Sequence, residues 1–194
     1  MASPSLRLGG KVALITGGAR GIGESIARVF AKNGAKVVIA DILDKPGRAV
    51  CQDLGPKVAN FVQCDVTDES HVENTVNSAV TRDGKLDIMV NNAAVGDEKK
   101  PSILDNQKSE FERVVGINLT GVFLDTKHAT RRQHHHSGKC LLGLGSMASH
   151  AHTSTKHAVV GLTRNVAAKL GRFDIRVNCL SLFIATPLLT MNFL

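Results

Sequence analysis

The chain has 194 residues, 43% hydrophobic and 21% charged, a composition typical of one globular domain with a buried core. The formal net charge of +7 suits a nucleic acid, an anionic membrane or an anionic small molecule, so charge alone selects no partner. Four cysteines without CxxC spacing and the lack of a long apolar run argue against a disulfide framework, a zinc site and a membrane span. We expect one cytoplasmic domain over residues 1–194.

Short apolar segments alternate along the chain with segments of helical periodicity. Strands that alternate with helices are joined by right-handed crossovers into a parallel sheet with helices on both faces. The sequence therefore predicts a doubly wound α/β fold, a Rossmann fold of three α/β/α layers. The expected strands are 12–15, 36–41, 58–65, 86–91 and 177–181, and the expected helices are 25–32, 69–82, 109–129 and 154–170.

A glycine-rich turn, TGGARGIG at 16–23, joins the first strand to the first helix. Such a turn lets backbone N–H groups approach a pyrophosphate at the start of a helix, although it is also compatible with a plain tight turn. Asp41 ends the second strand, where a carboxylate can accept hydrogen bonds from ribose hydroxyls and repel a 2′-phosphate. Arg20 argues for that phosphate, because a guanidinium can pair with it. We expect NAD as cofactor, with NADP less favoured.

Further motifs follow in order: CDV at 64–66, NNAA at 91–94, IN at 117–118 and TSTKHAVVGLT at 153–163. With the glycine-rich turn, they resemble the ordered motifs of the short-chain dehydrogenase/reductase family, and DNQKSEFERVVGINLTGVF resembles its plant members. The resemblance covers residues 6–130 and 146–188. It implies transfer of hydride between a nicotinamide and a hydrophobic secondary alcohol or ketone.

The resemblance also implies two groups of site residues. Asn118 would hold a water in a proton relay, and Lys156 would bind the nicotinamide ribose and lower the pKa of a phenol one helical turn earlier. The implied catalytic residues are Asn118, Ser146, His152 and Lys156. The expected cofactor-binding residues are Gly17, Arg20, Gly21, Ile22, Gly23, Asp41, Asp65, Val66, Asn91, Ala93, Lys156 and Thr186.

The phenol is missing, because position 152 is a histidine and the chain contains no tyrosine. An imidazole can act as a base, but it is shorter than a phenol, and a misplacement of about 1 Å can cost about a hundredfold in rate. We therefore expect impaired catalysis. One alternative is that His152 is an exposed residue at the start of a helix without a catalytic duty. Another is that the protein is a non-catalytic cofactor-binding or subunit-interaction homologue.

Residues 130–145 depart from the family pattern. The three histidines at 134–136 point in different directions along the chain, and no acid or thiol of ligand spacing completes a set, so we expect no metal site and a polar, solvated loop. The basic residues of this segment lack interleaved tyrosine or tryptophan, and we expect no nucleic-acid partner. Only five residues separate Ser146 from His152, fewer than in the family, so Ser146 fits its role only with a rerouted backbone. Ser149 is the other nearby hydroxyl, and a local change of splicing or reading frame would explain the segment.

The last expectation concerns the end of the chain. Doubly wound enzymes of this kind run to about 250 residues, so the final strand and the helices that cover the substrate are expected to be absent. The substrate therefore stays unnamed. An uncovered sheet face and an open strand edge predict instability or aggregation. The same resemblance implies a homo-oligomer through the helices near 109–129 and 154–170.

Overall fold

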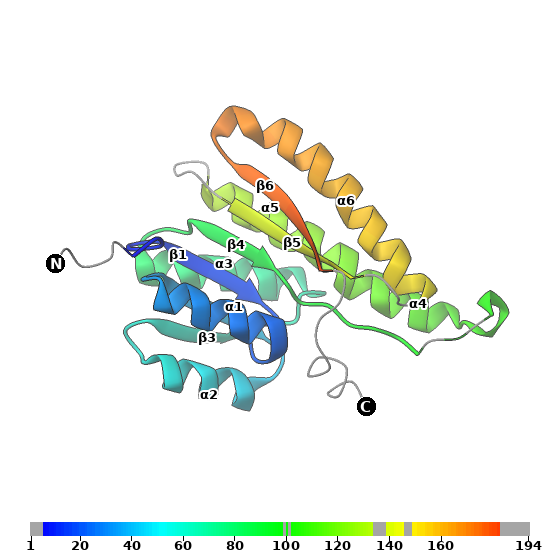
Figure 1. The fold of residues 1–194 in the computed structure, drawn as a ribbon, viewed down its shortest axis with the longest axis horizontal. Helices are drawn as coiled ribbons and strands as arrows, with labels where there is room; N and C mark the ends of the chain where they lie inside the picture. Colours follow the sequence, from blue (N-terminus) through cyan, green and yellow to red (C-terminus); the bar gives the residue numbers. More distant parts are fainter. Residues whose placement is uncertain (1–5, 99, 101, 134–138, 146–148, 183–194) are drawn as a thin grey trace.

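The structure is a computed structural model that describes residues 6–98, 100, 102–133, 139–145 and 149–182 (Figure 1). Strands and helices alternate along this part of the chain. The strands are β1 (Val12–Thr16), β2 (Lys36–Asp41), β3 (Ala59–Gln63), β4 (Ile88–Asn91), β5 (Lys139–Gly145) and β6 (Arg176–Leu182). The helices are α1 (Gly21–Lys32), α2 (Asp44–Leu54), α3 (Glu69–Asp83), α4 (Lys108–Val115), α5 (Val122–Gln133) and α6 (His150–Leu170). The short turns η1 (Ile103–Asp105), η2 (Gly116–Gly121) and η3 (Gly171–Phe173) complete the set.

The described strands form one parallel sheet in the order β3-β2-β1-β4-β5-β6. Helices α1 and α2 cover one face, and α3, α5 and α6 cover the other (Figure 1). The strand order reverses between β1 and β4, where the chain crosses from one half of the sheet to the other. The predicted doubly wound, three-layer fold is confirmed. In such folds ligands bind at this reversal, beyond the carboxyl ends of the strands.

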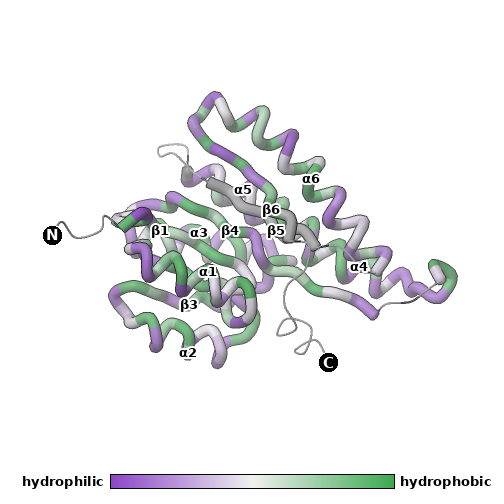
Figure 2. The backbone as a smooth tube through the Cα atoms, in the orientation of Figure 1, coloured by the Kyte–Doolittle hydropathy of each residue, from purple (hydrophilic) through white to green (hydrophobic). Residues whose placement is uncertain are grey.

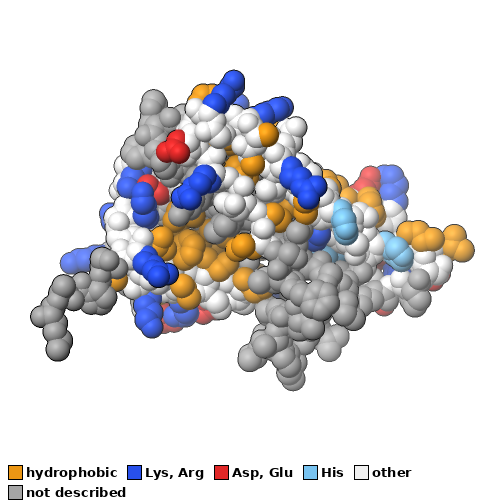
Figure 3. All heavy atoms as spheres, turned by 45° about the horizontal axis from the view of Figure 1, so that its top comes forward, with side chains coloured by type: hydrophobic (Ala, Val, Ile, Leu, Met, Phe, Trp, Pro, Cys, Tyr) orange, Lys and Arg blue, Asp and Glu red, His pale blue; other side chains and the backbone are white. Residues whose placement is uncertain are grey.

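Two apolar cores lie on opposite faces of the sheet. Along β2, Val37 and Ile39 pack toward α1 and α2, whereas Val38 and Ala40 pack toward α3 and α5. Because both faces are covered, the strand is a continuous apolar run without the alternation of a half-exposed strand. The central strands are accordingly mostly hydrophobic in Figure 2. The face shown in Figure 3 gathers hydrophobic side chains at its centre, with lysines and arginines around them.

The prediction of a polar loop over 130–145 is wrong for most of its residues. Residues 130–133 continue α5, and Lys139–Gly145 is strand β5, paired in parallel with β4 and β6. Hydrogen bonding to a strand on each side stabilises this segment as a strand, although the polar residues before it favour a loop. The three histidines at 134–136 lie outside the described residues.

Two helices also differ from the expectation. Helix α2 was not predicted, because Pro46 and Gly47 disfavour helix; Pro46 falls in the first turn, where its missing N–H costs no intrahelical bond. The expected helix 109–129 is divided into α4 and α5 by the π-helical turn η2. A π turn inserted in a helix often marks a functional site. Within the described residues no helix is long and apolar enough to cross a membrane.

Candidate cofactor and active site

The glycine-rich loop between β1 and α1 needs its glycines for steric reasons. Gly17 has a φ of +65°, and a Cβ there would lie 2.8 Å from the Cα of Ala93. A Cβ on Gly23 would lie 2.1 Å from the carbonyl oxygen of Gly17. The loop is thus packed tightly against the segment after β4 and against the first turn of α1. This close packing brings the N–H groups at the start of α1 to the edge of the sheet, where a pyrophosphate can bind.

A network around Thr16 and Asn92 holds the loop against the segment after β4. The Asn92 Nδ2 donates to the carbonyl oxygens of Thr16 and Gly17, each at 3.0 Å. The Thr16 Oγ1 accepts from the N–H groups of Asn92 and Ala93 at 3.2 and 3.3 Å. Our sequence analysis named Asn91, but that side chain is buried and donates to Thr126 of α5 at 3.2 Å. The motif NNAA predicted that this segment belongs to the site, but it did not show which of its two asparagines bonds to the glycine-rich loop.

Asp41 is fixed at the end of β2 by backbone donors. Its Oδ2 accepts from the N–H of Ala19 and its Oδ1 from the N–H of Leu43, both at 3.0 Å. Only 8% of the residue is exposed. Each carboxylate oxygen retains a further lone pair, so the side chain can still accept hydrogen bonds from ribose hydroxyls. Arg20, which is exposed, lies on the wall of the same cleft.

A cleft of about 1200 Å³ follows the carboxyl ends of β1, β2, β3 and β4. Gly23, the last residue of the glycine-rich turn, is buried in the first turn of α1 and does not line the cleft. The walls also include Thr67 and Leu43, which the sequence analysis did not single out, and Ile117 of the IN motif. The volume and the position at the carboxyl ends of the strands suit a dinucleotide. Of the expected cofactor residues, the lining contains Gly17, Arg20, Gly21, Ile22, Asp41, Asp65, Val66 and Ala93.

Asn118 clamps the segment after β4 from the π-helical turn η2. Its Nδ2 donates to the Val95 carbonyl at 2.9 Å, and its Oδ1 accepts from the Val95 N–H at 2.8 Å. Asn118 is 1% exposed, so both bonds are shielded from water. Because Val95 lines the cleft, this clamp fixes part of the cleft wall.

His152 contacts the same peptide group. It is the third residue of α6, and its Nδ1 lies 3.3 Å from the Val95 carbonyl oxygen. The expectation that this residue is exposed is wrong, because His152 is half-buried against this segment, whereas its catalytic duty stays a prediction. Burial lowers the pKa of His152 below its ordinary value and positive Lys156 lowers it further, while the Val95 carbonyl and Asp97 oppose the shift.

Lys156 lies one helical turn after His152, on the same side of α6. Burial lowers the pKa of Lys156, and the Cys179 thiol group of β6 acts in the opposite direction. The two side chains therefore form a pair in a partly desolvated region beside the cleft wall. Their relative placement in the chain matches the expectation, whereas their catalytic roles stay a prediction.

Ser149 uses its hydroxyl to begin α6. The Oγ accepts from the His152 N–H at 3.3 Å and donates to a carboxylate oxygen of Asp97. The residue is 6% exposed. A hydroxyl with one proton, already donated to Asp97, cannot donate it to a substrate as well. Ser146 and Thr186 lie outside the described residues.

Asp125 is a buried carboxyl group that the sequence analysis did not notice. It lies on α5 and its side chain bonds with Thr16, the residue at the centre of the loop network. Burial raises the pKa of Asp125 to about 8, and the bond with Thr16 opposes that shift. At pH 7 the carboxyl group is therefore mostly protonated in the folded chain.

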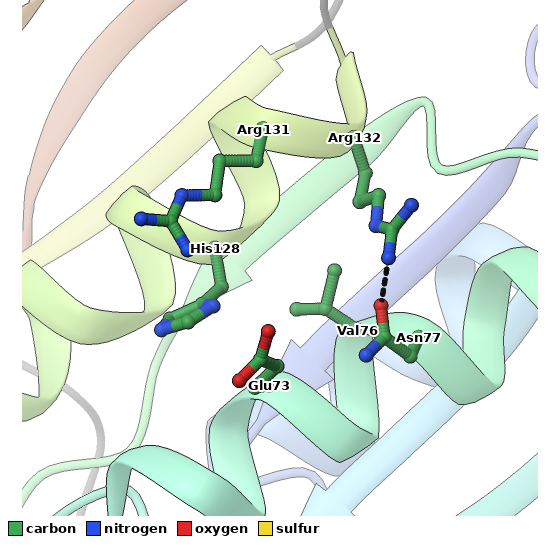
Figure 4. A pocket seen from close by; sticks show the side chains of 6 residues that line it. All are labelled: Glu73, Val76, Asn77, His128, Arg131 and Arg132. Carbon is green, nitrogen blue, oxygen red and sulfur yellow. Dashed lines mark hydrogen bonds between the residues drawn. The ribbon is translucent and has the colours of Figure 1, made fainter.

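A second, smaller cavity of about 290 Å³ lies between α3 and α5 (Figure 4). Its lining combines Arg131, Arg132 and His128 with Glu73, and Arg132 donates to the Asn77 Oδ1 at 2.6 Å. The arginines of the basic segment, Arg131 and Arg132, thus lie across the cavity from the carboxylate of Glu73 and the amide of Asn77. The cavity shares no lining residue with the large cleft. Across the described ranges, no three metal-binding side chains gather at one point.

Comparisons with known proteins agree with this geometry. A family profile described as short chain dehydrogenase matches residues 11–192. Secoisolariciresinol dehydrogenase of Forsythia intermedia is 50% identical over 91% of this chain and 66% of its own length. Mitochondrial borneol dehydrogenase of Lavandula x intermedia is 52% identical over 97% of this chain and 75% of its own length. The chain thus spans about two thirds to three quarters of the length of these relatives.

A solved structure shares the fold. The 3-ketoacyl-(acyl-carrier-protein) reductase from Brucella melitensis, complexed with NADH, superposes with a TM-score of 0.88 and is 35% identical. The superposition covers 94% of this chain and 80% of the reductase. The reductase therefore shares the arrangement of sheet and helices described here.

Proposed function

The chain belongs to the short-chain dehydrogenase family, and on this premise we propose that it binds NAD and transfers hydride between nicotinamide and a hydrophobic secondary alcohol or ketone. The observation that carries the proposal is the cleft itself. A glycine cradle that a single Cβ would fill lies beside a carboxylate at the end of β2. When bound, NAD supplies the hydride acceptor, and the protein supplies position and proton transfer.

The preference for NAD over NADP rests on Asp41. Its carboxylate is held by two backbone N–H groups, so it cannot swing away from a 2′-phosphate without losing both bonds. A buried negative group opposite a phosphate is repulsive. Arg20 can offset part of this repulsion, because it lies on the same cleft wall and is exposed.

The substrate class rests on the names of the relatives. They are dehydrogenases of secoisolariciresinol and borneol, which supports a small-molecule alcohol. In this proposal Asn118 holds the cleft wall, Lys156 provides a positive charge, and His152 takes the position of the proton-transferring residue. We expect this reaction to be slow, since the imidazole is short and the nearby Ser149 hydroxyl is engaged by Asp97.

The alternative is a non-catalytic homologue that binds the cofactor or another subunit. Phe111 of α4 and Phe123 of α5 favour it, because they are 42% and 49% exposed. Both lie on the helices near 109–129 that we expect to form an oligomer. A homo-oligomer and a cytoplasmic location are part of the proposal. The location rests on the cysteine pattern, and one relative is named as mitochondrial.

The test is a titration of the purified chain with NADH, followed by cofactor fluorescence, with NADPH as comparator. The chain has no tryptophan and no tyrosine, so its own background is small. Saturable binding that favours NADH supports the proposal. Asp41→Asn keeps the shape of the side chain, and we expect it to lose most of the preference for NADH. Absence of saturable binding by either cofactor would refute the proposal.

Turnover separates the two candidate functions. Oxidation of borneol or a similar secondary alcohol with NAD supports the enzyme, and binding without turnover supports the non-catalytic homologue. His152→Tyr restores the phenol that the family motif contains. We expect this variant to increase the rate of alcohol oxidation if the short imidazole is the main defect. An unchanged rate in the variant would place the defect elsewhere in the active site.

A further inference from the structure

Two candidate functional residues, Asn118 and His152, contact the Val95 peptide group. Its carbonyl oxygen accepts from the Asn118 Nδ2 at 2.9 Å and lies 3.3 Å from the His152 Nδ1. Its N–H donates to the Asn118 Oδ1 at 2.8 Å. A peptide held at both its N–H and its carbonyl cannot rotate. The carbonyl oxygen therefore has a fixed direction with respect to the imidazole ring.

This contact determines which nitrogen of His152 carries the proton. A carbonyl oxygen can only accept, so the Nδ1 must be the donor in a bond to Val95. In a neutral imidazole the Nε2 then carries the lone pair. The bond that one ring nitrogen makes thus fixes the chemistry of the other. Both Val95 and the glycine-rich loop line the same cleft, so this histidine lies beside the wall of the candidate cofactor site.

We infer that the Val95 peptide group, held by Asn118, fixes His152 in the Nδ1–H form and makes Nε2 the proton acceptor for a substrate hydroxyl. The inference deepens the proposed function and rests on it for its catalytic part. Asn118 is a positioning residue, because it acts on the imidazole through Val95. In alcohol oxidation the hydroxyl proton passes to Nε2, and the carbinol carbon gives its hydride, with two electrons, to oxidised nicotinamide dinucleotide. The products would be the carbonyl compound, the reduced dinucleotide, which carries the hydride, and the imidazolium, which carries the hydroxyl proton.

The surroundings favour the neutral form of the imidazole, which is the form that can accept a proton. Burial is the main cause of the lowered pKa of His152, and Lys156 on α6 acts in the same direction. Asp97, in the segment after β4, opposes them. Cys179 of β6 acts electrostatically on Lys156, whose pKa it raises. These are the titratable groups that act on the pair within the part of the chain that the structure describes.

The tautomer can be measured without any turnover. Long-range proton–nitrogen NMR spectra of the nitrogen-15-labelled full chain distinguish a protonated from an unprotonated ring nitrogen. The chain has eight histidines, and the signals that disappear in His152→Gln identify His152. We expect a protonated Nδ1 and an unprotonated Nε2 near pH 8. An unprotonated Nδ1 in the wild-type chain would overturn the inference, whatever the behaviour of any variant.

Asn118→Ala tests the clamp. We expect the Nε2–H form of His152 to become populated, and the rate constant kcat of alcohol oxidation to fall about tenfold or more with little change in the KM for NAD. Asn106→Ala is the matched control, because the Asn106 Nδ2 lies 3.4 Å from the Nδ1 of His150 on the same helix. We expect the control to leave the spectrum of His152 unchanged. A folded Asn118→Ala chain with the wild-type tautomer would contradict the role of Asn118.

The pH profile separates a positioning role from a purely structural one. We expect kcat for oxidation to rise as His152 loses its proton, with a midpoint below the ordinary histidine pKa of 6.5, and Asn118→Ala to move that midpoint. A midpoint that Asn118→Ala leaves unchanged would refute the catalytic part. Complete absence of turnover with an Nδ1–H imidazole would refute the proposed function and the proton transfer, while the tautomer result would still support the clamp.

Discussion

Asp125 is a single residue whose ionisation opposes folding. Its folded-state pKa of about 8 lies above the ordinary value of 3.8, because α5 holds the carboxyl group away from water. Below pH 3.8 the group is protonated in both states, and no stability is lost. Between about pH 4 and pH 8 the unfolded chain gives up the proton that the folded chain keeps, so stability falls as the pH rises. Above about pH 8 the loss is complete.

Asp125→Asn should remove this pH dependence, because an amide of similar shape does not ionise in this pH range. We expect the free energy of unfolding at pH 8 to be a few kcal/mol higher than that of the wild type, with little difference at pH 4. Urea unfolding followed by circular dichroism at both pH values measures it. Asp105→Asn, at an exposed aspartate, is the control. Equal slopes with pH for the wild type and Asp125→Asn would contradict the argument.

Gly23 tests the steric basis of the cofactor site. Gly23→Ala places a Cβ 2.1 Å from the Gly17 carbonyl oxygen, which is backbone and cannot move without shifting the loop. We expect NADH to bind at least about tenfold more weakly, because its pyrophosphate needs the close approach of this loop. Gly161→Ala on α6 is the matched control, since no atom lies within 4 Å of its added Cβ. Fluorescence titration compares the two, and equal affinities would count against a pyrophosphate site here.

At the scale of an element, the beginning of α6 sets the position of the active-site candidates. Ser149 is the N-cap, and its Oγ accepts from the N–H of His152. Ser149→Ala removes that acceptor and the donor to Asp97, and the cap alone contributes about 1 kcal/mol to the stability of a helix or protein. We expect a loss of about 1–2 kcal/mol in the free energy of unfolding.

Ser154→Ala is the control for this cap, because the exposed Ser154 hydroxyl donates to the His150 carbonyl within the same helix. We expect it to change stability by less than about 0.5 kcal/mol. Chemical unfolding of both variants gives the comparison. A Ser149→Ala chain as stable as Ser154→Ala would mean that the cap and the bond to Asp97 contribute nothing.

The elements differ in how far the sequence alone predicts them. The apolar run of β2 and the helical periodicity of α3 are confirmed, because local pattern and burial agree there. Strand β5 is missed, although its sequence KCLLGLG is a short apolar run, because the segment was interpreted together with its basic and histidine-rich neighbours. The cleft follows from the ordered motifs. The contact between His152 and Val95 does not follow from the motifs. It joins two residues that are 57 positions apart, one at the start of α6 and the other in the segment after β4.

At the scale of the whole molecule, the cleft connects four parallel strands. Its walls come from the segments after β1, β2, β3 and β4, together with residues of α4 and η2. A dinucleotide in the cleft would contact all of these segments at once. Unfolding of any one of them would then require release of the cofactor, so binding and global stability are linked.

We therefore expect NADH to raise the melting temperature of the chain. At a free concentration of about 100 times the dissociation constant, the linkage adds about 2.7 kcal/mol to the free energy of unfolding. For a chain of this size that corresponds to an increase of roughly 5–10 °C, measurable by circular dichroism. Gly23→Ala should show a much smaller increase at the same NADH concentration, and NADPH should give less than NADH if Asp41 repels its 2′-phosphate. A melting temperature independent of both cofactors would mean that the cleft does not bind a dinucleotide in solution.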